Sequence, residues 1–402
     1  MAPLVPRCKN PGVQILFTCI PQSGHLFPLF PLAEAFAADG HDVLFAAGAD
    51  TADAVQTRGL SFRETGPPFV DWFGALAART RGLPGDGLPP DRVERYFLPR
   101  LFGEVGTALF VDDLLKAAAE RRPDLLVFDP VMYAAPIVAK KLGIAAVQHT
   151  VGLSTDWLTL ELVEDAVSPI WREFGYQVPA AAGMFDGATV AVCPPSLDPA
   201  AVERPRVLSM RPTQLPGQDA PPLPAEFAEP ERPLVYLTLG TFSNNLDVFQ
   251  LVLDALADET VNVVVTVGRD NMPSRLRADS RFVHIAQFLP QAAVLPWCSA
   301  AVHHAGAGTA FGVLAHGLPA VALPQSADNF AIADRLAAAG AARVVPPAEV
   351  TPETVRDAVR TVLADGAYRD GSCRLANEIA AMPPPENAAR SLVSWVAGRG
   401  LG

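Results

Sequence analysis

Residues 302–309 read Val-His-His-Ala-Gly-Ala-Gly-Thr and stand between an apolar run and a short helical pattern. The apolar run is typical of the end of a buried strand, and Gly306, Gly308 and Thr309 then open a helix. The first N–H groups of a helix have no partner inside it and lie at the positive end of its dipole, so they favour a phosphate. His304 adjoins this point and can donate one more hydrogen bond to a diphosphate oxygen. The stretch therefore predicts a diphosphate site at a strand-to-helix junction.

A second polar motif follows the next predicted strand. Residues 317–329 read Gly-Leu-Pro-Ala-Val-Ala-Leu-Pro-Gln-Ser-Ala-Asp-Asn. The carboxylate of Asp328 and the amide of Asn329 can pair with several hydroxyl groups of a polyol. Taken with the diphosphate site, this motif indicates a ligand in which a diphosphate is joined to a sugar.

The same glycines permit a second interpretation. Residues 306–312 come close to a dinucleotide-binding fingerprint, and Asp328 follows at about the distance expected of a ribose-binding acid. A nicotinamide-dependent oxidoreductase is therefore an alternative, although Gly312 comes one position late and the unit is not the first of its sheet. A third interpretation is a plain tight turn without a ligand. A P-loop is excluded, because no Gly-Lys-Ser/Thr follows.

Composition indicates a globular α/β protein with room for two domains. The chain has 402 residues, of which 50% are hydrophobic and 18% charged. The net charge of -12 argues against nucleic acid or an anionic membrane surface as a general partner. The 5 cysteines are scattered and form no C-x-x-C pair, so we expect neither a disulfide framework nor a zinc site, and we expect a cytoplasmic location. No apolar run approaches the ~20 residues of a membrane span.

A catalytic pair is predicted in the N-terminal half. Residues 13–20 have the continuous apolar character of a central parallel strand, and His25 follows where a helix begins. Asp129 ends another such strand, so both side chains belong to the edge where open α/β sheets bind ligands. A carboxylate on Nδ1 of His25 would fix its tautomer and leave Nε2 to accept a proton. Alone, His25 is simply a histidine at a helix start. Gln148 and His149 end the next strand and are candidates for the lining of the same site.

The strand and helix alternation breaks down between Thr65 and Leu101. This span carries several Gly-Pro or Pro-Pro pairs and the aromatic residues Phe69, Trp72, Phe73, Tyr96 and Phe97. We predict a long loop here. Its aromatic side chains either line an apolar pocket or pack against the domain's own core.

Two doubly wound, Rossmann-like α/β domains facing each other across a cleft are the predicted fold. We place the first domain, with the predicted catalytic pair, at residues 1–214 and a proline-rich linker at 215–232, where prolines exclude helix and central strand. The second domain, with the predicted diphosphate site, is placed at residues 233–383. It begins with an apolar strand that ends in Gly240 and Thr241, and it closes with helices near 351–365 and 368–382.

The run His304-Ala-Gly-Ala-Gly-Thr, with Gly317-Leu-Pro and residues 324–329, resembles the donor motif of nucleotide-sugar glycosyltransferases of the GT-B fold, and most closely their bacterial natural-product branch. The sequence departs from that motif in Ala305, where glycine is frequent, and in Asn329, where glutamine is usual. We expect Ala305 to matter little. The family's site residues transfer onto matching positions here: His25 and Asp129 as catalytic pair, and Thr241, Phe288, Leu289, His304, Gly306, Gly308, Thr309, Asp328 and Asn329 as donor-binding residues. Phe288 would stack on the nucleotide base, and a helix within residues 384–402 would return to the first domain.

The resemblance implies an inverting transferase that uses a TDP- or UDP-sugar and a hydroxyl group of an apolar small-molecule natural product. His25 would deprotonate the acceptor, while His304, Thr309 and the helix N–H groups stabilise the leaving diphosphate. No Asp-x-Asp pair occurs, so we expect neither a metal nor a further cofactor. A catalytically silent partner of another transferase is the remaining alternative, against which His25 and Asp129 argue. A homodimer stays open.

Overall fold

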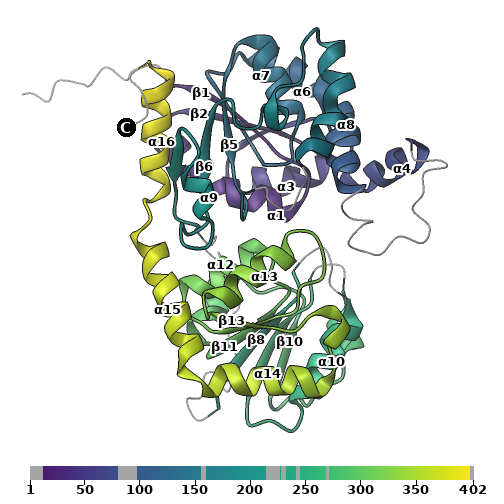
Figure 1. The fold of residues 1–402 in the computed structure, drawn as a ribbon, viewed down its shortest axis with the longest axis vertical. Coiled ribbons are helices and arrows are strands. Elements are labelled where there is room, and N and C mark those ends of the chain that lie inside the picture. Colours follow the sequence, from purple (N-terminus) through teal and green to yellow (C-terminus); the bar gives the residue numbers. More distant parts are fainter. Residues whose placement is uncertain are drawn as a thin grey trace, which may run out of the picture.

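The computed structural model describes residues 12–79, 97–154, 160–213, 227, 232–240, 245–268 and 271–398. Two α/β domains lie one above the other, each built on its own sheet (Figure 1). Of the predicted linker, only Phe227 and Arg232 fall within these ranges. The predicted fold class, two doubly wound domains, is confirmed.

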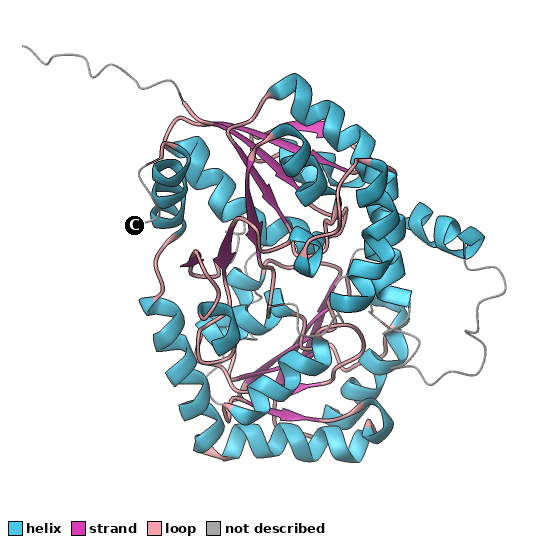
Figure 2. Cartoon of the chain, turned by 45° about the horizontal axis from the view of Figure 1, so that its top comes forward, coloured by secondary structure: helices cyan, strands magenta, loops and turns pink. Residues whose placement is uncertain are grey.

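The N-terminal domain is built on a 7-stranded parallel sheet with the order β3-β2-β1-β4-β5-β6-β7. Its strands are β1 (Gln14–Thr18), β2 (Asp42–Ala47), β3 (Ser61–Glu64), β4 (Leu125–Phe128), β5 (Ala145–His149), β6 (Ala188–Ala191) and β7 (Val207–Ser209). The central strand β4 is buried along its whole length, because helices cover both faces of the sheet (Figure 2). That burial explains why its sequence is continuously apolar.

Helices connect these strands and cover the sheet. They are α1 (Ser23–Leu26), α2 (Phe30–Ala38), α3 (Ala52–Gln56), α4 (Phe69–Arg79), the π-helical η3 (Pro99–Gly106), α6 (Thr107–Arg121), α7 (Ala134–Leu142), α8 (Leu160–Glu173) and α9 (Pro199–Val202). Short 3-10 turns are η1 (Phe27–Leu29), η2 (Ala49–Thr51) and η4 (Ala180–Gly183). Because η1 continues α1 into α2, the helical run after β1 starts at Ser23, two residues before His25.

The prediction of a loop between Thr65 and Leu101 is wrong for its first part, which forms helix α4. Phe69 and Trp72 on α4 are buried against Phe110 of α6, with the Trp72 and Phe110 ring centroids 5.5 Å apart. Their apolar spacing on one helix face outweighed the glycines and prolines that flank them. These two aromatics therefore belong to the domain's own core. Tyr96 lies outside the described residues.

The C-terminal domain has a 6-stranded parallel sheet with the order β10-β9-β8-β11-β12-β13. Its strands are β8 (Leu234–Thr238), β9 (Asn262–Thr266), β10 (Val283–Ala286), β11 (Ala300–His303), β12 (Ala320–Ala322) and β13 (Ala342–Val344). Its helices are α10 (Leu246–Leu256), α11 (Gln291–Val294), α12 (Ala307–Ala315), α13 (Asn329–Ala338), α14 (Pro352–Ala364) and α15 (Gly366–Ala381), with 3-10 turns η6 (Pro273–Arg275), η7 (Leu295–Trp297) and η8 (Pro347–Glu349).

Both sheets reverse their strand order at one place. In the N-terminal sheet the reversal lies between β1 and β4, and in the C-terminal sheet it lies between β8 and β11. The connections leaving two such neighbours run to opposite faces, which opens a crevice outside the carboxyl ends of the strands. The predicted site residues His25, Asp129 and His304 all follow strands at these two reversals.

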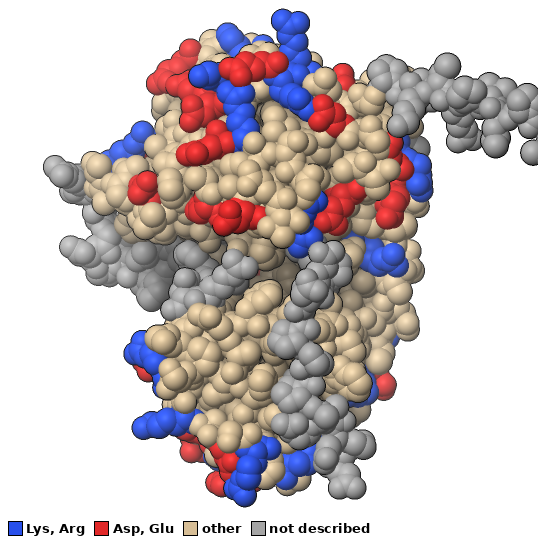
Figure 3. Space-filling view, turned by 180° about the vertical axis from the view of Figure 1, so that it is seen from behind, with Lys and Arg blue, Asp and Glu red and all other residues tan. Residues whose placement is uncertain are grey.

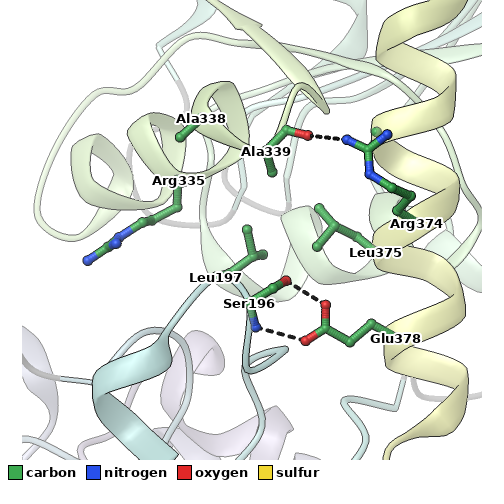
Figure 4. A pocket seen from close by; sticks show the side chains of 9 residues that line it. Ser196, Leu197, Arg335, Ala338, Ala339, Arg374, Leu375 and Glu378 are labelled. Carbon is green, nitrogen blue, oxygen red and sulfur yellow. Dashed lines mark hydrogen bonds between the residues drawn. The ribbon is translucent and has the colours of Figure 1, made fainter.

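The chain returns to the N-terminal domain through its last helices, as Figure 1 shows in yellow. Helix α16 (Pro385–Val396) packs on α2 and buries Leu392 completely. We call the place where the chain passes from α15 to α16, and so from the C-terminal to the N-terminal domain, the crossing. There Glu378 of α15 accepts hydrogen bonds from the backbone N–H and the hydroxyl group of Ser196, at 2.8 and 2.5 Å (Figure 4). These contacts join the last helices to the N-terminal domain.

The described surface carries charges of both signs. Lysine and arginine lie among aspartate and glutamate on the face shown in Figure 3, with no broad basic area. Among the residues that the structure describes, no helix has the length and apolar character needed to cross a membrane.

We predict that Leu392→Ala will destabilise the N-terminal domain, because the leucine is fully buried and its truncation leaves a cavity under α16. The expected cost is about 2–5 kcal/mol, seen in calorimetry as a midpoint lowered by roughly 5–15 °C. Leu142→Ala is the control, since Leu142 is 38% exposed at the end of α7 and should cost much less. Equal midpoints for wild type and Leu392→Ala would show that α16 adds nothing to this core.

Candidate functional site

His25 and Asp129 meet at the reversal of the N-terminal sheet. Nδ1 of His25 lies 3.4 Å from Oδ2 of Asp129, with the imidazole one-fifth exposed and the carboxylate fully buried. This is ion-pair range, but Nδ1 forms no hydrogen bond to any described residue. In ligand-free sites such contacts are often long and tighten in the reacting complex. The structure therefore brings the predicted pair together, and Nε2 of His25 makes no hydrogen bond to a residue that the structure describes.

Asp129 is fixed by the backbone rather than by other side chains. Its Oδ2 accepts a hydrogen bond from the Ile20 N–H at 2.7 Å, and its Oδ1 accepts one from the Val131 N–H at 2.7 Å. Backbone N–H donors of this kind compensate the burial of a carboxylate. The carboxylate thus holds both the loop after β1 and the start of the turn after β4, and it cannot turn away from His25 without losing these bonds.

His149 ends β5 and does not reach an open site. Its side chain is fully buried, Nδ1 donates to the Thr150 carbonyl at 2.7 Å, and burial lowers its pKa to about 4. The ring is therefore neutral, and its Nε2 has no partner among the described residues. Gln148 is also buried, with neither end of its amide paired to a described residue. Burial therefore keeps His149 from serving as the base for an acceptor in this structure, and the neutral amide of Gln148 is not a base.

His304 lies in a slot between two glycines of the C-terminal domain. A methyl group added to Gly240 would lie 2.6 Å from the ring, and one added to Gly306 would lie 2.2 Å from Nε2. Burial lowers the pKa of His304 to about 4, so the ring is neutral and has a single N–H to donate. The glycines are thus needed for the ring to occupy this place, a reason that the sequence alone did not reveal.

The N-terminus of α12 is open, as a phosphate site requires. Gly306 occupies the cap position and provides no side-chain hydrogen bond, so the first N–H groups of the helix have no side-chain cap. Gly308 is exposed and its position would leave space for an added methyl group. The hydroxyl group of Thr309 accepts a hydrogen bond from Gln291 Nε2 at 3.0 Å, which fixes its position in the first turn. Gln291 is a supporting residue that the sequence interpretation did not assign.

Ala305 takes a left-handed backbone conformation, which the sequence alone did not reveal. Its φ is 64°, a region that glycine adopts freely and alanine adopts at a cost of about 1–2 kcal/mol. The small effect expected of alanine at this position on donor binding stays a prediction. Ala327, in the loop after β12, is also left-handed, with a φ of 50°.

Asp328 and Asn329 stand at the start of α13 and differ in their surroundings. The Asp328 side chain does not cap the helix, and its desolvation raises its pKa to about 6, against a smaller lowering effect of the nearby His25 side chain. Asn329 is buried, and one end of its side-chain amide lies 3.1 Å from the Ser326 carbonyl and 3.3 Å from the His304 carbonyl. Because two carbonyl groups need a donor, this end is assigned as the amide nitrogen. Asn329 therefore ties the loop after β12 to the loop after β11. Its contact with a sugar stays a prediction.

The two domains touch at this site. A methyl group added to Gly152, which follows β5, would lie 2.8 Å from the Ala307 side chain and 3.2 Å from Oδ2 of Asp328. Glycine here lets the edge that carries His25 approach the start of α12. No sequence signal beyond a glycine after a strand end could have singled out Gly152, since its partners lie in the other domain.

Phe288 and Leu289 follow β10 at the same edge of the C-terminal sheet. Phe288 is 54% exposed, whereas Leu289 is buried in the core that the two domains share. Stacking of a nucleotide base on this aromatic ring stays a prediction. Leu289 instead anchors the turn. Thr241 lies outside the described residues.

A separate pocket of about 380 Å³ lies beside the domain crossing and contains none of the predicted site residues (Figure 4). Arg335, Arg374 and Glu378 contribute its charged side chains. Within the described ranges, no group of three or more histidine, cysteine, aspartate or glutamate side chains is arranged to hold a metal ion.

Comparisons with known proteins identify relatives along almost the whole chain. The family described as erythromycin biosynthesis protein CIII-like matches through its N-terminal domain at residues 95–240 and its C-terminal domain at residues 250–395. The L-demethylnoviosyl transferase of Streptomyces niveus is 30% identical, with 95% of this chain and 98% of the relative covered. The 3-alpha-mycarosylerythronolide B desosaminyl transferase of Saccharopolyspora erythraea is 28% identical, with 96% and 99% covered.

Solved structures agree with these relatives. The crystal structure of glycosyltransferase VinC in complex with DTDP superposes with a TM-score of 0.76 at 25% identity, covering 96% of this chain and 100% of that chain. The match extends over both domains and the crossing between them.

We predict that Gly306→Ala will weaken the binding of a nucleoside diphosphate roughly tenfold or more, because the new methyl group displaces the His304 ring. In a His304→Ala background the same change should add little, since the clash is gone. Calorimetric affinities of the two single variants and the double variant measure this coupling. Gly308→Ala, whose methyl group meets nothing within 4 Å, should show no coupling to His304→Ala. If the losses of nucleotide affinity in Gly306→Ala and His304→Ala were additive in the double variant, Gly306 would not be needed to make room for the His304 ring.

We also predict that Asp328→Asn stabilises the ligand-free protein at neutral pH. Because the folded pKa of this carboxyl group is raised to about 6, its contribution to stability is present below about pH 4 and is lost as the pH rises through about 6. Near pH 8 the free energy of unfolding of the variant should therefore exceed that of wild type by about 1–2 kcal/mol, seen as a higher melting temperature. The difference should shrink toward about pH 5. A difference that is independent of pH would rule out desolvation of Asp328 as its cause.

Proposed function

The chain belongs to the erythromycin biosynthesis protein CIII-like family of glycosyltransferases, and on this premise we propose that it moves a sugar, with inversion, from a nucleoside diphosphate to a hydroxyl group of an apolar natural product. One observation carries the proposal. The His25 and Asp129 pair and the open start of α12 lie on facing edges of the two domains, which touch where Gly152 meets Ala307. A base and a diphosphate site at these two edges would flank one reacting carbon.

His25 is proposed as the general base for the acceptor. Its free Nε2 would take the proton of the hydroxyl group, and the buried carboxylate of Asp129 would stabilise the imidazolium that forms. Because the two backbone N–H bonds hold Asp129 in place, the ring has a fixed partner whatever its protonation. The oxygen of the acceptor then attacks the anomeric carbon as the bond to the diphosphate breaks, and this single displacement inverts the carbon.

The leaving diphosphate would be bound by the C-terminal domain. Negative charge grows on its oxygens as the bond to the sugar breaks, and the uncapped N–H groups of α12, the Thr309 hydroxyl group and the single N–H of neutral His304 would stabilise it. Gly306 and Gly308 leave the backbone accessible to the phosphates, and Asp328 would accept hydrogen bonds from sugar hydroxyl groups.

We infer thymidine diphosphate as the preferred nucleotide over uridine diphosphate. The related glycosyltransferase VinC was solved with DTDP, and the exposed ring of Phe288 fits stacking on a pyrimidine. Leu289 would hold Phe288 at the edge of the sheet. Thr241 is proposed as a further phosphate or sugar contact on the family resemblance alone.

The acceptor is proposed to be an apolar natural product bound mainly by the N-terminal domain. This inference is supported by the names of the relatives, one of which acts on mycarosylerythronolide B, a small-molecule acceptor. The nicotinamide-dependent alternative gains no support from any comparison. The silent-partner alternative is disfavoured because His25 and Asp129 are present and adjacent. Independence from metals and cofactors, a cytoplasmic location and a homodimer stay predictions.

We predict that His25→Ala lowers turnover with an alcohol acceptor by roughly 10²–10⁴, the usual contribution of a positioned general base, while the affinity for thymidine diphosphate changes little. A more acidic phenol should shrink the loss, because it needs less help to release its proton. Steady-state rates with a panel of TDP- and UDP-sugars, and calorimetry for the nucleotide, measure both effects.

His316→Ala provides a matched histidine control, since His316 is exposed at the end of α12, away from Asp129. It should keep full turnover. Should His25→Ala keep it too, the base assignment is wrong. A wild-type protein that binds neither nucleotide would instead overturn the donor assignment.

A further inference from the structure

We propose that His303 is a positioning residue for the donor, whose side chain holds the left-handed turn that orients His304 and opens the start of α12. The inference rests on the proposed function only in naming the bound group as a nucleoside diphosphate. His303 contacts no ligand in this mechanism and acts through the backbone at Ala305.

The contact is a single buried hydrogen bond. His303 ends β11 and is fully buried, and its Nδ1 accepts a hydrogen bond from the Ala305 N–H at 2.9 Å. Burial lowers its pKa to about 3, so the ring is neutral, with Nδ1 as acceptor and the proton on Nε2. A side-chain acceptor that pairs with the N–H two residues ahead stabilises a turn in the manner of asparagine and aspartate.

The turn needs such support because its residue is alanine. Ala305 has a φ of 64°, which alanine disfavours, and its methyl group is fully buried in the core shared by the two domains. From this turn the His304 ring enters the slot between Gly240 and Gly306, and the His304 carbonyl faces the amide of Asn329 at 3.3 Å. His303 thus fixes the turn from the strand side and Asn329 from the helix side.

A purely space-filling role does not explain the choice of histidine. Nε2 of His303 carries a proton that finds no acceptor among the described residues, and a buried unpaired N–H is costly. A leucine would fill the same space without that cost. The function of His303 therefore depends on Nδ1 as the acceptor of the Ala305 N–H.

Two substitutions distinguish the role of His303 as a hydrogen-bond acceptor from a role in filling space. His303→Asn keeps an acceptor near the Ala305 N–H but fills the space poorly, whereas His303→Leu fills the space and removes the acceptor. We expect His303→Leu to be folded and to bind thymidine diphosphate roughly tenfold more weakly, because a smaller fraction of molecules holds the turn. His303→Asn should stay within about threefold of wild type. The space-filling role predicts the opposite order.

Ala305→Gly provides the second arm, since glycine takes the left-handed conformation without help. Alone it should change nucleotide affinity little, and combined with His303→Leu it should restore most of the loss. Hydrogen exchange at the residue 305 amide, followed by mass spectrometry without any nucleotide, should be faster in His303→Leu than in wild type and His303→Asn.

Three results would overturn the inference: unchanged affinity in His303→Leu, no restoration by Ala305→Gly, or equal exchange at residue 305 in all variants. A wild-type protein that binds neither thymidine nor uridine diphosphate overturns the proposed function and the donor role of His303 with it, whereas the exchange experiment still reports on the turn itself. Unfolding midpoints of all variants are measured alongside, so that a loss of fold is distinguished from a loss of the turn.

Discussion

Unpaired backbone N–H groups at strand-to-helix junctions are the constraint on which both halves of the site depend. Parallel strands that reverse their order leave such groups at the carboxyl edge of each sheet. In the N-terminal domain the chain satisfies two of them itself, with the carboxylate of Asp129 on the Ile20 and Val131 N–H groups. In the C-terminal domain Gly306 provides no cap, so the N–H groups at the start of α12 stay available to an anion. In the proposed mechanism one junction holds the catalytic carboxylate and the other receives the diphosphate.

Neutral histidines fit this way of binding an anion. Burial keeps His303 and His304 uncharged, and the chain as a whole has a net charge of -12. In the proposed donor site a diphosphate would be held by directed hydrogen bonds from N–H groups rather than by a basic field, which would also attract unrelated polyanions. Burial at the contact between the domains also desolvates the carboxylate of Asp328 and raises its pKa.

Close approach of the domains depends on contacts on both sides of the molecule. Gly152 lets the N-terminal edge meet Ala307 and Asp328, while the bonds from Ser196 to Glu378 and the packing of α16 on α2 join the domains at the crossing. The crossing lies on one side of the molecule, where Figure 1 shows α15 leading into α16. A substitution at either contact is therefore able to change the site without touching a ligand.

The sequence by itself determined the fold class and the position of most site residues. Apolar runs, glycine junctions and the helical pattern that follows are local features, so His25, Asp129 and His304 were each placed at a strand end from their neighbours in the chain. The sequence did not determine contacts between distant segments, since strand order is not encoded locally. Only the tertiary structure put Asp129 3.4 Å from His25, set His304 between Gly240 and Gly306, and joined Gly152 to Ala307. It also turned part of a predicted loop into α4, because burial of Phe69 and Trp72 outweighed the local turn signals.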